Sequence, residues 1–189
     1  RLLLDTPSGI VNPVLSPDEK WVAFTRENDL YVIELHTGIE TRLTHDGSDV
    51  ILNGYASWVY YEEILGRESR YRSFWWSPDS KHLAFFRSDD SGVPVFPLYN
   101  STGQHGYTEN TRYPKAGDPN PEVCIGMIRI DSKQVVWADF SKEEDQYFGK
   151  PCGQPDGQGL LVQWMPREQN NLKLYRIDPR SGQKKEIYD

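Results

Sequence analysis

The stretch that organises this chain reads WSPDSKHLAFFR, at residues 76–87. Ser-Pro-Asp predicts a turn, because proline presets the first dihedral angles of the turn and aspartate hydrogen-bonds back to the backbone. The apolar residues that follow predict a strand. The same arrangement occurs earlier as SPDEKWVAF, at 16–24, and more loosely later as QPDGQGLLVQW, at 154–164. Such a repeat of turn and strand is typical of the blades of a β-propeller.

The three copies predict an all-β fold, a partial β-propeller of about three four-stranded antiparallel blades. We expect blades at 13–44, 73–131 and 132–189, with an insertion at 45–72 and, within the second blade, an extended arm at about 89–121. Three blades do not close a ring, which usually needs about four to eight. We therefore expect residues 1–189 to form a fragment of a larger propeller.

The composition narrows the class of function. The 189 residues suffice for one domain with a core, and the net charge of −7 argues against nucleic acid as a partner, since its binders carry a basic surface. A solvated acidic surface and a site for a cationic ligand are both compatible with this charge. The two cysteines and four scattered histidines lack metal-ligand spacing, so the sequence predicts no metal and no cofactor.

The insertion at 45–72 contains the sequence WVYYEEI, at 58–64, in which aromatic residues lie directly before two adjacent carboxylates. Few helix breakers besides Gly66 occur between Tyr61 and Arg70, so we expect a short helix there. Glu62 and Glu63 repel one another when both are charged, because like charges disfavour the charged form. A positive ligand between them would relieve this repulsion, and the pair is therefore a candidate binding site.

Blander interpretations of this insertion remain open. Glu62 and Glu63 could be ordinary surface acids on a solvated helix face. Arg67, Arg70 and Arg72 are interpreted as solvated bases or as ion-pair partners of nearby acids, rather than as substrate ligands. The nearby aromatic residues are interpreted as packing residues that hold the glutamate segment in place, namely Trp58, Tyr60, Trp75 and Trp76.

The second insertion, at 89–121, is rich in proline and in apolar residues. Its prolines are Pro94, Pro97, Pro114, Pro119 and Pro121. Proline cannot donate to a sheet ladder, so this density favours an extended arm at an edge over a central strand. The alternative is a loose surface excursion, which would leave its apolar side chains exposed to water.

Four blocks of this sequence resemble a known family. They are WVYYEEI at 58–64, FWWSPD at 74–79, Val93-Pro94, and YPKAGDPNP at 113–121. In order and relative spacing they resemble the propeller domain of the dipeptidyl peptidase IV family. The resemblance covers essentially the whole chain and is weakest at the first dozen residues and after Lys142.

The resemblance implies part of a serine exopeptidase that releases dipeptides from peptide N-termini, with proline or alanine often second. In that family a larger propeller covers an α/β-hydrolase domain. The positions of Glu62 and Glu63 match the adjacent glutamates that bind the free α-ammonium of the substrate. The family also uses a propeller arginine beside these glutamates, and no residue of this chain can be matched to it.

The resemblance implies no catalytic residue in this chain. No serine here has the Gly-x-Ser-x-Gly context of a hydrolase nucleophile, so the triad is expected beyond Asp189. The implied partners are a peptide with a free N-terminal amine, the hydrolase domain of the same chain, and a second copy bound through the arm at 93–121. The implied location is extracytoplasmic, periplasmic or at the cell surface. The alternatives are a protein-binding scaffold from a catalytically inactive relative and a relative that takes tripeptides or other N-terminal lengths.

Overall fold

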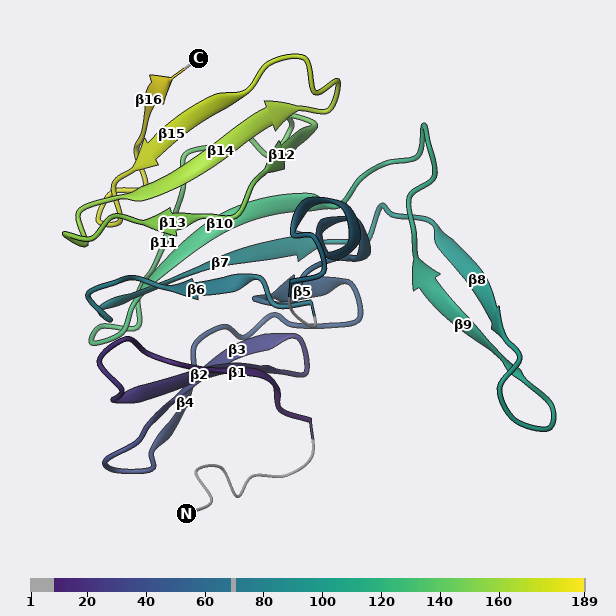
Figure 1. The fold of residues 1–189 in the computed structure, drawn as a ribbon, viewed down its shortest axis with the longest axis horizontal. Coiled ribbons are helices and arrows are strands. Elements are labelled where there is room, and N and C mark those ends of the chain that lie inside the picture. The colour runs from purple at the N-terminus through teal and green to yellow at the C-terminus, as the bar shows by residue number, and fades with distance from the viewer. Residues whose placement is uncertain (1–8, 69–70, 189) are drawn as a thin grey trace.

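The computed structural model of the chain describes residues 9–68 and 71–188. It shows three antiparallel sheets stacked one on another, with a two-stranded hairpin projecting to one side (Figure 1). One short helical turn lies between the fifth and sixth strands of the described chain. The expected all-β fold, with three blades, a short helical insertion and an extended arm, is confirmed.

The first sheet has the strand order β1-β2-β3-β4, and sequential neighbours pair throughout. Its strands are β1 (Val11–Leu15), β2 (Trp21–Arg26), β3 (Asp29–Glu34) and β4 (Glu40–Arg42). This is the up-and-down meander that the short strands and tight turns of the sequence predict.

The Ser-Pro-Asp turns hold their shape through side-chain hydrogen bonds. In the first copy, Ser16 donates its hydroxyl to Asp18 (2.7 Å) and accepts the backbone N–H of Trp21 (3.0 Å). In the second copy, Ser77 donates to Asp79 (2.6 Å) in the same way. The serine therefore links the turn to the start of the following strand, which explains why the motif precedes a strand in both blades.

The second sheet has the order β11-β10-β7-β5, and β6 also pairs with β7. Its strands are β5 (Ile51–Asn53), β6 (Phe74–Trp76), β7 (His82–Asp89), β10 (Glu122–Arg129) and β11 (Val135–Trp137). The third sheet has the order β12-β14-β15-β16, with β13 also paired to β14. Its strands are β12 (Gln146–Phe148), β13 (Cys152–Gly153), β14 (Leu160–Pro166), β15 (Lys173–Ile177) and β16 (Lys184–Tyr188).

Two blade boundaries differ from the expected ones. We expected the third blade to begin at 132, but β11 pairs with β10, so the second sheet continues to Trp137. We treated 45–72 as an insertion outside the blades, but β5 within it pairs with β7. The reason is that a local pattern shows where a strand forms and not which strand it pairs with, since pairing joins segments far apart in the chain.

Two adjacent phenylalanines of β7 belong to different cores. Phe85 and Phe86 are both fully buried. Successive side chains of a strand point to opposite faces, so Phe85 packs with Leu30 and Val32 of the first sheet, and Phe86 packs with Val162 of the third. The second sheet is therefore buried on both faces, which agrees with the apolar run of its central strand.

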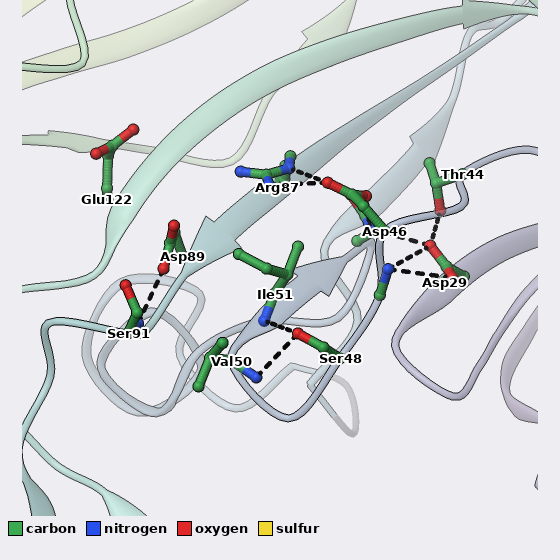
Figure 2. A network of polar contacts seen from close by, with 12 residues as sticks. Asp29, Thr44, Asp46, Ser48, Val50, Ile51, Arg87, Asp89, Ser91 and Glu122 are labelled. Atoms are coloured by element: carbon green, nitrogen blue, oxygen red, sulfur yellow. Dashed lines mark hydrogen bonds and ion pairs between the residues drawn. The ribbon is translucent and has the colours of Figure 1, made fainter.

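A polar network joins the first sheet to the second (Figure 2). The carboxylate of Asp29 is fully buried and accepts hydrogen bonds from Thr44 (2.5 Å) and from the side-chain amide of Asn53 (3.0 Å). Asp46 accepts hydrogen bonds from Asn53 (2.8 Å) and from Arg87 on β7 (2.9 Å). The buried Asp29 also has a charged partner in Arg42 of β4. Its hydrogen bond from Asn53 ties β5, and with it the second sheet, to the first sheet.

The arm is an ordered hairpin of β8 (Val95–Asn100) and β9 (Tyr107–Arg112), directed away from the stacked sheets (Figure 1). Pro97 lies in β8, which is an edge strand and therefore tolerates a residue without an N–H. Several large apolar side chains on the hairpin are exposed: Val95, Leu98, Tyr99 and Tyr107.

Candidate functional site

The adjacent glutamates lie on a single turn of π-helix, Tyr60–Ile64, between β5 and β6. The backbone N–H of Leu65 donates to the carbonyl of Tyr60 (2.7 Å), which is the wide i to i+5 hydrogen bond of such a turn. The sequence predicts a short helix over 61–70. The structure confirms a helical turn but places it at 60–64, before the left-handed Gly66. We call residues 57–68 the glutamate turn. Turns of this kind are often found at functional sites.

Tyr60 attaches the glutamate turn to the second and third sheets. Its side chain is buried, and its ring packs edge-on against Phe86 of β7 at 5.5 Å between centroids. Its hydroxyl accepts a hydrogen bond from the backbone N–H of Phe148 in β12 (3.2 Å). Burial raises the pKa of Tyr60, because the charged phenolate would lose its hydration. Through these two contacts, Tyr60 fixes the turn to the second and third sheets.

Other aromatic residues hold the glutamate turn from its sides. Tyr61 stacks on Tyr71 at 3.9 Å between centroids, and Tyr71 stacks in turn on Tyr55 at 5.2 Å. Trp58 packs against Tyr113, which follows the arm, at 4.2 Å. These contacts give Trp58 and its neighbours the packing role that the sequence suggested, and they place the segment that follows the arm beside the turn.

The two glutamates have different surroundings. The side chain of Glu62 is 14% exposed and forms an ion pair with Arg67. Glu63 is exposed and lines a hollow of about 420 Å³, together with Ile64 and residues of β12 and β14 that include Tyr147. Glu62 is not among the residues that line this hollow. The structure therefore places the two predicted site residues side by side in the chain without directing both into one cavity.

The end of the glutamate turn is also tied to the third sheet. Glu68 forms an ion pair with Lys150 (2.6 Å), which follows β12. The hydrogen bond from Lys150 lowers the pKa of the Glu68 carboxyl. Sequence reasoning missed Lys150, because nothing local to it marks a partner 82 residues away. Of the three arginines interpreted as ion-pair partners, Arg67 pairs as expected, while Arg70 lies outside the described residues.

The described residues contain no candidate metal site. Across residues 9–68 and 71–188, no group of three or more His, Cys, Asp or Glu side chains could hold a metal ion. In the same part of the chain, no helix has the length and apolar character needed to cross a membrane.

The two cysteines are both free thiols. Cys124 is half-buried and Cys152 is exposed. Burial raises the pKa of the Cys124 thiol.

Comparison with known proteins places the chain in a family. A family model described as the dipeptidyl peptidase IV (DPP IV) N-terminal region matches residues 3–188. A protein of Talaromyces stipitatus named as a probable dipeptidyl-aminopeptidase B is 36% identical over 196 residues, covering 94% of this chain and 21% of that protein. A protein of Phaeosphaeria nodorum, also named as a probable dipeptidyl-aminopeptidase B, is 33% identical over 178 residues, covering 86% of this chain and 19% of that protein.

A solved structure shows the same fold. The crystal structure of Porphyromonas gingivalis dipeptidyl peptidase 4 matches with a TM-score of 0.87 and 29% sequence identity, covering 98% of this chain and 26% of that one. The chain spans about a fifth of the length of the curated relatives it matches. With its blades, its glutamate turn and its arm, the chain belongs to the dipeptidyl peptidase IV family, as part of the N-terminal region.

Proposed function

We propose that this region anchors the N-terminus of a peptide substrate in a serine-type dipeptidyl peptidase. The observation that carries the proposal is the glutamate turn, on which Glu62 and Glu63 are adjacent and the backbone is fixed by two sheets. A carboxylate about 4 Å from an ammonium gains roughly 4 kcal/mol at an effective dielectric constant near 20, before desolvation. Two carboxylates beside one ammonium also relieve their mutual repulsion when the ligand binds.

Such an anchor would select both the substrate and the length of the product. A peptide with a blocked N-terminus would lose this attraction, and the two adjacent carboxylates would keep their mutual repulsion. In the proposed arrangement, two residues fit between the anchor and the nucleophile of a hydrolase domain, so the enzyme releases dipeptides such as Xaa-Pro or Xaa-Ala. The chemistry belongs to that domain, and the region described here gates and orients the substrate without cleaving it.

The test is a pair of conservative substitutions in the full-length peptidase that contains this chain. Glu62→Gln and Glu63→Gln keep the shape of each side chain and remove its charge. We expect at least one of them to reduce kcat/KM for a free-amine dipeptide substrate by about a hundredfold, since each removes a charge partner. The matched control is Glu143→Gln, an exposed glutamate in the loop between β11 and β12. Wild-type kinetics in both site variants would disprove the anchor.

The proposed partners include a second copy of the chain, bound through the arm. The exposed side chains of Leu98, Tyr99 and Tyr107 support this proposal, because a hairpin that projects into solvent gains by covering them. The extracytoplasmic location and the contact with a hydrolase domain stay predictions from the family.

A further inference from the structure

The chain reverses direction at Arg67, whose backbone has a left-handed conformation. Both Gly66 and Arg67 have left-handed backbone conformations, with φ of 65° and 57°. Glycine adopts this conformation freely, whereas it is uncommon for other residues. The backbone N–H of Arg67 donates to the carbonyl of Tyr61 (3.0 Å), which holds the reversal in place. Residues kept in such positions often cluster at functional sites.

The reversal places the guanidinium of Arg67 against Glu62, the less exposed of the two adjacent glutamates. Within the described part of the chain, the Oε2 atom of Glu62 is buried and accepts no hydrogen bond, and its charged partner is the guanidinium of Arg67. The Arg67 side chain itself is 68% exposed, so packing does not explain its position. A buried carboxylate oxygen without a counterion is unfavourable, and Arg67 supplies that counterion.

The ion pair leaves a simple balance of charge on the turn. Glu68 is paired with Lys150, so the remaining charges of the turn, Glu62, Glu63 and Arg67, sum to one negative charge, which matches a single ammonium. Glu63 is exposed beside its hollow and has no ion pair among those found in the described residues. The two neighbouring glutamates therefore differ: Glu62 is paired and mostly buried, whereas Glu63 is exposed at the hollow.

We propose that Arg67 is a positioning residue of the amine anchor: its ion pair holds Glu62 in place beside Glu63, whose own carboxylate is free to bind the ammonium. The inference rests on the proposed function, since it assigns roles within the same site. Arg67 acts through Glu62 and does not itself contact the substrate in this arrangement. Arg67 would therefore affect how strongly the enzyme prefers a substrate with a free N-terminal amine over one without it.

The test compares two substrates that differ only at the amine, using the full-length peptidase. In acetyl-Pro-p-nitroanilide, a hydrogen replaces the ammonium of Gly-Pro-p-nitroanilide. The ratio of their kcat/KM values measures recognition of the amine. We expect Arg67→Ala to lower this ratio about tenfold, through a higher KM for the amine substrate, while kcat and the acetyl substrate change little.

Three further variants separate positioning from general structure. Arg67→Lys keeps the charge and should restore most of the ratio. In an enzyme already carrying Glu62→Gln, Arg67→Ala should have no further effect, because its target is gone. Arg129→Ala removes an exposed arginine that pairs with Asp131 (2.7 Å) far along the second sheet, and it should change nothing.

The outcomes distinguish the two proposals. If the wild-type enzyme does not prefer the amine substrate, the anchor itself is wrong. If it does, and Glu63→Gln abolishes the preference, the anchor stands. Arg67 is then refuted as a positioning residue if Arg67→Ala leaves the ratio unchanged, raises it, or weakens both substrates equally. A raised ratio would show that Arg67 competes with the amine.

Discussion

The hydroxyl of Tyr60 accepts a hydrogen bond from the backbone N–H of Phe148 at 3.2 Å, across 88 residues of sequence. Both residues are buried. The bond fixes the glutamate turn to β12, and so the proposed anchor takes its position from the third sheet as much as from its own segment. Its loss would leave a buried donor without a partner.

Tyr60→Phe tests this attachment, since it removes the hydroxyl and keeps the ring. We expect the protein to lose about 1–3 kcal/mol of unfolding free energy, because the N–H of Phe148 becomes unsatisfied in the core. Urea unfolding followed by tryptophan fluorescence measures the change. Tyr188→Phe is the matched control, as its side chain on β16 is largely exposed. Equal stabilities for the two variants would mean that the buried bond contributes nothing.

Asp90 at the base of the arm predicts a dependence of stability on pH. Its carboxyl is buried, its Oδ1 atom has no hydrogen-bond partner among the described residues, and burial raises its pKa to about 7. The charge of Arg112 opposes this rise in pKa, and that of Asp89 adds to it. The folded protein therefore keeps the proton at pH values where the unfolded chain has lost it.

The sign of the pH dependence follows from this difference in bound protons. The contribution of Asp90 to stability is complete below the ordinary pKa of 3.8, falls as pH rises, and is lost by about pH 7. A rise in pKa from 3.8 to about 7 corresponds to at most about 4 kcal/mol of unfolding free energy. Asp90→Asn should remove this slope from a series of urea unfolding curves, whereas Asp49→Asn, at an exposed site, should keep it. A slope that persists in Asp90→Asn would contradict the assignment.

Gly126 on β10 is opposite Phe85 on β7, and the ring occupies the space where a side chain would lie. A Cβ atom at Gly126 would come within 2.3 Å of the ring of Phe85, which is fully buried between two sheets and cannot withdraw. We expect Gly126→Ala to cost about 1–3 kcal/mol of unfolding free energy by overpacking.

Thermal unfolding of Gly126→Ala measures this cost. Gly92→Ala is the matched control, because nothing lies within 4 Å of its Cβ position and its backbone is not left-handed. A normal melting temperature for Gly126→Ala would show that the two sheets can shift to admit a methyl group.

The proposed dimer through the arm predicts a change of mass in solution. Tyr99 is 72% exposed near the tip of β8, so Tyr99→Asp should place a charge in the interface without disturbing the blades. We expect the full-length wild-type protein to elute as a dimer and the variant as a monomer in size-exclusion chromatography with light scattering. Tyr188→Asp, another exposed tyrosine, should remain dimeric. A monomeric wild-type protein, or a dimeric Tyr99→Asp variant, would rule out the arm as the interface.

Part of this architecture could be predicted from local sequence, because some interactions join residues that are close together in the chain. The Ser16 and Ser77 turns form through hydrogen bonds to residues two to five positions away, so the motif itself contains most of the interaction. The blades, the short helical turn and the projecting arm followed from such signals, and the family blocks identified Glu62 and Glu63 as candidates. Gly66 is a further local signal, because a glycine there permits the reversal that directs Arg67 to Glu62.

Local sequence was therefore enough to specify where strands and turns form and which family the chain belongs to, because these depend on neighbouring residues and on ordered blocks. Long-range packing was needed to bring β5 and β11 into the second sheet, to bond Tyr60 to Phe148, and to place Glu63 beside a hollow lined by the third sheet. These features depend on pairing and burial between distant segments. The difference between two identical neighbouring carboxylates arises from what the fold places around each of them.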